Sequence, residues 1–103
     1  MVSLIYSTMG SFDEAKRIGR KLVEEKLVAC VNIVPQVFSI YRWKDAIEED
    51  EEVVLLAKTK DTLIADVIVK IRDLHSYDVP DIVALPINSG LDDYLMYVDK
   101  ETL

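Results

Sequence analysis

The chain has 103 residues, half of them hydrophobic, with three glycines, three prolines and a formal net charge of −7. This length allows one domain with a single core, which we expect residues 1–103 to form. The composition excludes a disordered or low-complexity chain. The negative charge argues against a nucleic-acid binder, because phosphate contacts need clustered lysine and arginine.

Cysteine content and hydropathy indicate where the protein works. The single cysteine cannot form an internal disulfide, so the reducing cytoplasm is the expected compartment. Residues 1–6 are too short for the apolar core of a signal peptide, and no basic segment precedes them. No apolar run approaches the roughly 20 residues of a membrane span. We therefore expect a soluble intracellular domain without a membrane partner.

The N-terminal part of the chain predicts a strand followed by a helix. Residues 2–7 form a short apolar run that is typical of a buried strand and ends before Gly10. Ser11 and Glu14 fit a capping box that opens a helix ending near Lys26. The apolar face of this helix consists of Ala15, Ile18, Leu22 and Val23.

Residues 30–43 predict one long strand, because β-branched and aromatic residues alternate with others along it. Pro35 cannot donate to a strand ladder, so we expect a bend, bulge or edge there. Fully extended, the stretch would span about 45 Å, whereas a compact domain of this size is roughly 35 Å across. The strand should project, and covering its exposed end, with Tyr41 and Trp43, predicts an oligomer.

An acidic run, residues 48–52, precedes a strand that we predict over residues 53–59 and that pairs back as a hairpin. The acids are either a patch for cations or the solvated edge of the hairpin. The second interpretation is favoured, since charges on an edge resist unwanted pairing and isolated acids repel more than they chelate.

The second half of the chain repeats the order of the first. Residues 61–74 predict a helix with Asp61 or Thr62 as its cap, because polar residues spaced by four and three trace one of its faces. A loop over residues 75–80, a strand over 81–87 and a turn over 88–90 follow. A short last helix is indicated by Leu91, Tyr94, Leu95 and Val98. The order β-α-β-β-α-β plus a terminal helix predicts an α+β fold of the ferredoxin-like class.

No catalytic motif is present: there is no phosphate-binding glycine loop, nucleophile elbow, or cysteine or histidine pair at metal spacing. We therefore do not expect an enzyme. Cys30 lies in an apolar strand and is expected to be a buried structural thiol. His75, at a predicted helix end, is either functional or a cationic cap of that end.

Two further sites have alternative interpretations. Lys58, near a strand end, either holds an anion or is a solvated terminus, and the second is more common. Tyr41 and Trp43 form either a ligand cage or a subunit-interface anchor, and the interface is favoured.

Several segments closely resemble the CutA family of divalent-cation tolerance proteins. They are residues 27–33, 39–43, 51–59, 75–80 and 93–95, so the resemblance extends over essentially the whole chain. It implies a ferredoxin-like protomer with a long β-hairpin and a tight homotrimer similar to PII signalling proteins. It also implies binding of copper and other divalent metal ions, with no established reaction and no required cofactor.

Four residues depart from the pattern of that family. Ser76 replaces the proline of a histidine-proline-tyrosine sequence, and Asp81 stands where a glutamate is frequent. Asp45 occupies a hairpin position usually held by glycine, and aspartate tolerates a left-handed turn less well. Tyr97 replaces a common tryptophan. Asp81 and Tyr97 bear on the chemistry of the pocket.

Two functions follow from the resemblance. In the first, the trimer binds copper or another divalent cation through Cys30 or His75 with nearby carboxylates, and takes part in the response to metal ions. In the second, it is a PII-like sensor that signals to an unidentified protein partner. Its intersubunit pocket, with Lys58, His75, Tyr77 and Asp81, would hold a small anion.

Overall fold

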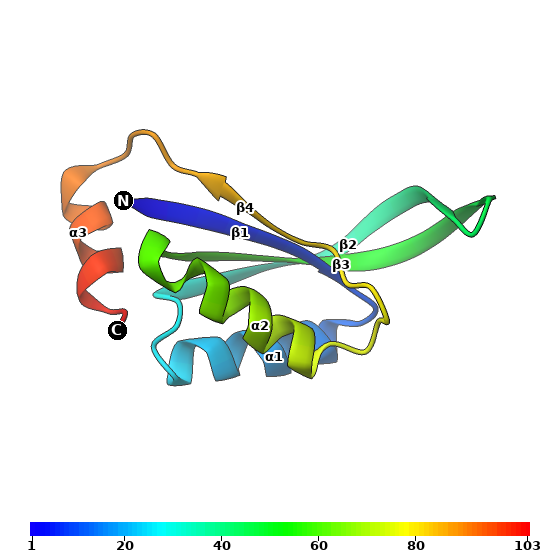
Figure 1. Cartoon of the computed structure of the whole chain (residues 1–103), viewed down its shortest axis with the longest axis horizontal. Helices are drawn as coiled ribbons and strands as arrows, with labels where there is room; N and C mark the ends of the chain where they lie inside the picture. Colours follow the sequence, from blue (N-terminus) through cyan, green and yellow to red (C-terminus); the bar gives the residue numbers. More distant parts are fainter.

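Four strands form one antiparallel sheet in the computed structural model, which describes residues 1–103 (Figure 1). The elements are β1 (Val2–Met9), α1 (Phe12–Glu24), β2 (Cys30–Trp43), β3 (Ala46–Lys60), the 3-10 turn η1 (Asp61–Leu63), α2 (Ile64–Leu74), β4 (Ile82–Pro86) and α3 (Asp92–Lys100). The strand order β2-β3-β1-β4 confirms the predicted ferredoxin-like α+β fold with an additional C-terminal helix.

The core lies between the sheet and the two helices α1 and α2, which cover the same face (Figure 1). The largest fully buried side chains there include Ile5, Met9, Ile18, Leu22, Leu55, Val67 and Ile71. Odd-numbered residues of β1 point to the helices, as the period of a strand requires. The apolar face of α1 was predicted correctly except for Val23, which is 41% exposed.

The start of α1 is capped as predicted, but by half of a capping box. The Ser11 hydroxyl accepts a hydrogen bond from the backbone N–H of Glu14 at 3.1 Å. The Glu14 carboxylate does not return to Ser11 and bonds to the loop after α2 instead. The local motif therefore frees Glu14 for a contact that joins distant parts of the chain.

The end of α1 has the two hydrogen bonds of a Schellman motif. The backbone N–H of Lys26 donates to the Val23 carbonyl at 3.0 Å, and that of Leu27 donates to the Leu22 carbonyl at 3.0 Å. Lys26 has φ of 58°, so a lysine occupies the left-handed position at which glycine is usual.

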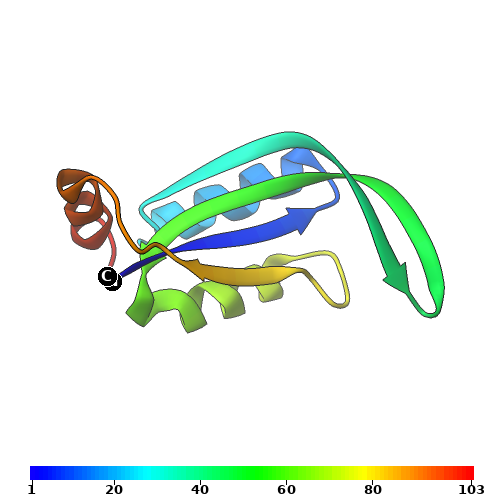
Figure 2. The ribbon, with the colours of Figure 1, turned by 90° about the horizontal axis from the view of Figure 1, so that it is seen from above.

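The β2–β3 hairpin projects beyond the rest of the molecule (Figure 1). With the hairpin included, the longest extent of the chain is 44 Å. The register shifts between Val34 and Val37, which confirms a bulge at Pro35. In Figure 2 the outer half of the hairpin bends toward the edge of the sheet that carries β4. The hairpin ends in a two-residue turn in which Lys44 and Asp45 have φ of 48° and 66°. Positive φ at both residues is typical of a type I′ turn, whose backbone twist matches the right-handed twist of the two paired strands.

Two predictions, the start of β3 and the cap of α2, are wrong because contacts with distant parts of the chain decide them. β3 begins at Ala46, not at residue 53, so the acidic run lies inside a strand that pairs with β2. Cross-strand hydrogen bonds hold it there despite the repulsion between its charges. Asp61 does not cap α2, since its carboxylate accepts a hydrogen bond from the Ser3 hydroxyl at 2.7 Å and no side chain caps that helix.

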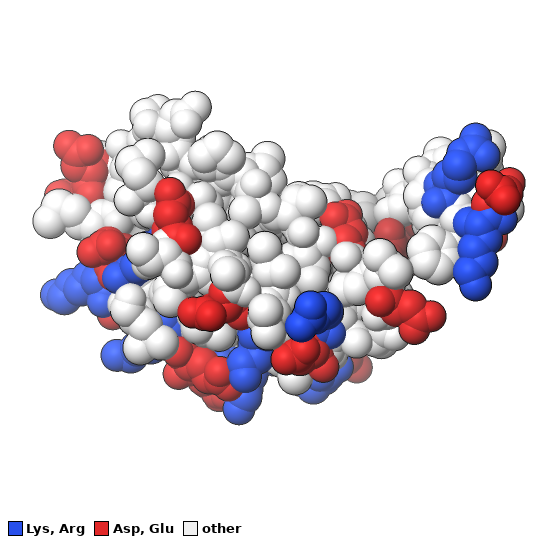
Figure 3. Space-filling view, in the orientation of Figure 1, with Lys and Arg blue, Asp and Glu red and all other residues white.

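The other face of the sheet is covered by a helix only at one end, where Val98 of α3 packs against Val2. Along β1, β3 and β4 this face carries Leu4, Tyr6, Val54, Leu56, Val83 and Leu85, which the strand registers place in adjacent rows. Val83 and Leu85 are 47% and 46% exposed. In Figure 3 charged side chains gather over the helices and at the hairpin tip, whereas the surface above β1 and β4 is largely uncharged. None of the helices is long and apolar enough to cross a membrane.

Candidate functional site

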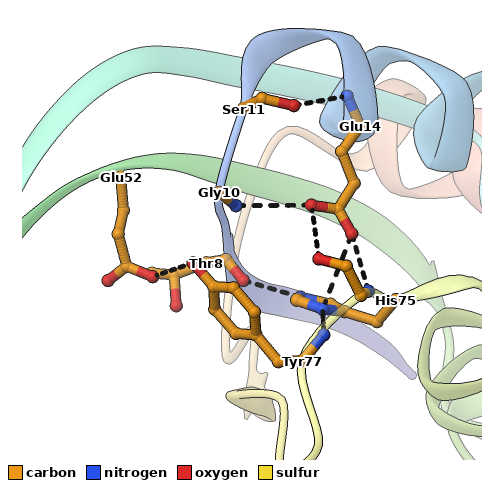
Figure 4. Close-up of polar contacts among 8 residues, drawn as sticks. Thr8, Gly10, Ser11, Glu14, Glu52, His75 and Tyr77 are labelled. Atoms are coloured by element: carbon orange, nitrogen blue, oxygen red, sulfur yellow. Dashed lines mark hydrogen bonds and ion pairs between the residues drawn. The ribbon is translucent and has the colours of Figure 1, made fainter.

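A buried polar network joins the end of β1, the start of α1 and the loop after α2 (Figure 4). Glu14 is its centre. Its carboxylate accepts hydrogen bonds from the backbone N–H of Ser76 at 2.8 Å, the Ser76 hydroxyl at 3.1 Å and the backbone N–H of Gly10 at 3.4 Å. Burial raises the pKa of Glu14, but the hydrogen bonds from Ser76 outweigh burial, so that the pKa lies below its ordinary value.

The His75 ring is fully buried, and both of its nitrogens have partners. The backbone N–H of Tyr77 donates to Nδ1 at 3.1 Å, so Nε2 carries the ring proton and donates to the Thr8 carbonyl at 2.8 Å (Figure 4). Glu14 Oε2 lies 3.7 Å from Nδ1. His75 is the C-cap residue of α2, and its backbone N–H donates to the Arg72 carbonyl, but its ring bonds to β1 and to the backbone of Tyr77 rather than to the carbonyls of the helix end.

The loop after α2 also reaches the hairpin. The Tyr77 phenol donates a hydrogen bond to Glu52 Oε2 at 2.8 Å, and Glu52 lies in β3 (Figure 4). Burial and the Glu52 carboxylate raise the pKa of Tyr77, which keeps the phenol protonated as a donor.

A cavity of about 690 Å³ opens between this loop and the outer half of the hairpin. Its aromatic lining consists of Tyr6, Phe38, Tyr41, Trp43 and Tyr77. Its carboxylates are Asp50, Glu52, Asp78 and Asp81, and no lysine, arginine or histidine lines it. The remaining lining residues are uncharged, so the cavity is acidic with aromatic walls.

The charges in the cavity influence one another. Burial and the charge of Glu52 raise the pKa of Asp81. The Tyr41 phenol donates to Asp50, and this hydrogen bond, with burial and neighbouring carboxylates, raises the pKa of Tyr41 to about 12. Each tyrosine therefore orients a carboxylate without neutralising it.

A second polar cluster lies at the opposite end of the sheet. Cys30 Sγ is 3.2 Å from the Tyr94 hydroxyl and 3.7 Å from Lys58 Nζ, and Lys58 Nζ is 5.5 Å from the centre of the Tyr94 ring. Cys30 is half-buried rather than enclosed in the core. Burial lowers the pKa of Lys58, but the adjacent Cys30 and Tyr94 outweigh it and raise the value.

Within one chain, the predicted pocket residues divide between these two places. His75, Tyr77 and Asp81 lie beside the cavity, together with Tyr41 and Trp43, whereas Lys58 and Cys30 do not. Lys58 pairs with Leu4, and His75 bonds to Thr8, so the two are separated along β1 by roughly 13 Å. No three histidine, cysteine, aspartate or glutamate side chains lie close enough together to hold a metal ion.

Sequence reasoning missed two residues of the site. Glu14 fits a capping box, which gave no reason to expect a second role. Glu52 is the last of five consecutive acids, and only strand alternation, which turns it to the side opposite Glu51, distinguishes it from its neighbours.

Comparisons with known proteins give a consistent result over the whole chain. A family model described as "CutA1 divalent ion tolerance protein" matches residues 3–101. The divalent-cation tolerance protein CutA of Thermus thermophilus is 43% identical over 102 residues, which cover 99% of each chain. Protein CutA of Mus musculus is 42% identical over 101 residues, and the matched part is 57% of that longer protein. The chain thus spans a little over half the length of its mouse relative.

Solved structures agree with the sequence relatives. The Thermus thermophilus divalent cation tolerance protein superposes with a TM-score of 0.96 at 43% identity, covering 99% of each chain. The periplasmic divalent cation tolerance protein CutA of Archaeoglobus fulgidus superposes with a TM-score of 0.95 at 39% identity, covering 98% of each chain.

Proposed function

Because the chain belongs to the CutA1 family of divalent ion tolerance proteins, we propose that it is a homotrimer that binds copper or another divalent metal ion. Its role is then in the response to metal ions, with the ion as cargo and no reaction catalysed. The family is named for ion tolerance and not for a reaction, which supports a binding function.

The observation that supports assembly is the apolar part of the sheet face that α3 leaves uncovered. Leu4, Val83 and Leu85 lie on it. The projecting hairpin separately exposes Phe38, Ile40 and Ile47, each by more than 60%. Large apolar side chains exposed in this way are usually covered by another protein. The resemblance to the family and to PII proteins favours three copies, with the projecting hairpin of each reaching a neighbour.

The metal ligands must come from the assembled protein. His75 uses both ring nitrogens inside its own chain, so it would need to lose a hydrogen bond before binding an ion. Cys30 is half-buried, and a soft thiolate suits copper, but Lys58 lies beside it. We therefore propose Cys30 as the first ligand, with further ligands supplied by a neighbouring copy.

The alternative is a PII-like sensor that binds a small anion through Lys58 and His75. Since these residues are apart in one chain, the pocket would have to form between copies, with Lys58 as the cationic group. Tyr77 and Asp81 lie beside an acidic cavity, which disfavours an anion at that end.

Measurements of mass, of copper binding and of anion binding on the native protein and its variants separate the two functions. Light scattering on the native protein should give about three times the 11.7 kDa chain mass. Calorimetric titration with copper should then show binding that Cys30→Ser abolishes and Lys58→Ala preserves, with the exposed-site variant Lys16→Ala as the control. If Cys30→Ser and His75→Gln both bind copper as the parent does, the proposed ligands are wrong. If phosphate or a carboxylate raises the melting temperature and Lys58→Ala abolishes this effect, the sensor is correct.

We propose that the protein works in a reducing compartment. The single cysteine supports a reducing compartment such as the cytoplasm.

A further inference from the structure

The hairpin leaves the sheet at Glu52. The pairing of β1 with β3 ends at Met9 and Val53, so from Glu52 outward β3 is paired only with β2. The register of β2 and β3 shifts at the same place, since Glu52 pairs with Val37 on the outer side of the bulge at Pro35. A bulge interrupts the ladder and bends the strands, and a two-stranded ribbon is only marginally stable by itself. The angle of the outer hairpin therefore depends on other contacts made at this point.

The loop after α2 makes such a contact. The Tyr77 phenol donates a hydrogen bond to Glu52 Oε2 at 2.8 Å (Figure 4). Glu52 is only 9% exposed, so this bond is shielded from water, which would otherwise compete for the carboxylate. The loop thus holds the hairpin by the first residue that β1 no longer supports.

The same loop is fastened to the body of the domain by the two residues before Tyr77. The backbone N–H and the hydroxyl of Ser76 donate to the Glu14 carboxylate at 2.8 and 3.1 Å. The His75 ring donates to the Thr8 carbonyl at 2.8 Å (Figure 4). Glu14 lies in the first turn of α1 and is 8% exposed, so its position is fixed by the core. Three consecutive residues therefore bond to β1, to α1 and to the hairpin.

We propose that residues 75–77 are a strap that sets the angle at which the hairpin leaves the sheet, with Glu14 as its anchor and Tyr77 as its contact with Glu52. The strap lies within one chain and does not require assembly. Its consequence for assembly rests on the proposed function: because the hairpin of each copy reaches a neighbour, Ser76 and Tyr77 control the strength of the trimer as positioning residues.

Hydrogen exchange of the native protein tests the strap. Tyr77→Phe removes its contact with the hairpin, and Ser76→Pro removes its bonds to Glu14, because proline has neither an N–H nor a hydroxyl. His75 has φ of −78° and ψ of 147°, the conformation that a residue before proline adopts. In both variants the amides of residues 36–52 should exchange about fivefold faster or more relative to those of residues 2–9.

The ratio between the two segments separates a strap from a general loss of stability. Ile18→Val, in the core and away from the strap, is the matched control and should leave the ratio unchanged. If Ser76→Pro and Tyr77→Phe also leave it unchanged, the ladder or a neighbouring copy fixes the hairpin and the proposal is wrong. If Ser76→Pro does not fold, Ser76→Ala replaces it. This variant keeps the N–H and loses the hydroxyl, so a smaller rise of the ratio is expected.

The double variant tests whether the two bonds belong to one strap. Ser76→Pro combined with Tyr77→Phe should show the ratio of the faster single variant, because a strap that is already open is not opened further. A ratio equal to the product of the single effects would mean that the bonds act independently, and would overturn the proposal.

Light scattering on the same samples separates this proposal from the proposed function. A parent that is a monomer contradicts the trimer, while a changed exchange ratio in the variants still supports the strap. If the parent is a trimer, both variants should dissociate at higher protein concentrations than the parent. Equal dissociation of parent and variants would contradict the control of assembly by the strap.

Discussion

Tyr77 and Glu52 are joined by a hydrogen bond of 2.8 Å that connects the loop after α2 to the projecting hairpin. Tyr77→Phe should destabilise the protein by about 1–3 kcal/mol, because it leaves a buried carboxylate without its donor. Urea unfolding of parent and variant measures this difference. Tyr97→Phe, at an exposed tyrosine without such a bond, should change the stability by less than about 0.5 kcal/mol. Equal effects of the two variants would show that the Tyr77 hydroxyl is not needed for stability.

Glu14 should make the stability depend on pH in the acidic range. Its pKa is below the ordinary value of 4.5 because the Ser76 hydrogen bonds outweigh burial. A carboxyl group with a lowered pKa stabilises the folded state above its unfolded pKa, and this contribution is lost as the pH falls through the folded pKa.

The Glu14→Gln variant tests this dependence. It should be less stable than the parent at pH 7, and the difference should shrink as the pH is lowered from about 5 toward 3. Unfolding midpoints in urea at each pH give the comparison. A difference that stays constant over this range would mean that the charge of Glu14 does not contribute.

The hairpin turn contains a residue that glycine should improve. Asp45 has φ of 66°, where a Cβ crowds the backbone. Asp45→Gly should therefore raise the stability by about 0.5–1 kcal/mol, which thermal unfolding will show as a higher Tm. Glu48→Gly, in the extended part of the same hairpin, is the control and should lower the Tm. A clear loss in Asp45→Gly would indicate a specific bond made by the aspartate.

Gly19 brings α1 close to β2. A Cβ at this position would lie 2.9 Å from Val31 Cγ1. Alanine favours a helix over glycine by about 1 kcal/mol, but overpacking costs about 1–3 kcal/mol, so Gly19→Ala should destabilise the protein. Adding Val31→Ala makes room for the methyl group.

A double-mutant cycle measures this coupling. The double variant should be more stable than the sum of the single effects predicts, because the two residues are in contact. Additive effects would show that the helix moves away from the strand at no cost.

The elements of the fold follow from local patterns in the sequence. The alternation from Cys30 to Trp43 and the proline at residue 35 predicted a long, bulged strand, and the structure has it. The β-branched residues of α2 favour a strand, but its polar residues recur with helical spacing on one face, which faces water. The helix predicted from that spacing is the structure found. Local signals were insufficient at element ends, since Asp61 bonds to Ser3 and the acidic run pairs with β2.

The site was decided by the tertiary structure. The sequence marked His75, Tyr77, Asp81, Tyr41 and Trp43 as residues of interest, and they do surround one region. It did not indicate that Lys58 lies at the other end of β1, or that Glu14 and Glu52 belong to the site. Glu14 bonds to Ser76 across 62 positions and Tyr77 to Glu52 across 25. Such contacts form only when the sheet brings distant strands together, so no local pattern records them. A carboxylate in an acidic run looks the same whether water or a cavity wall surrounds it, and only the packed chain distinguishes the two.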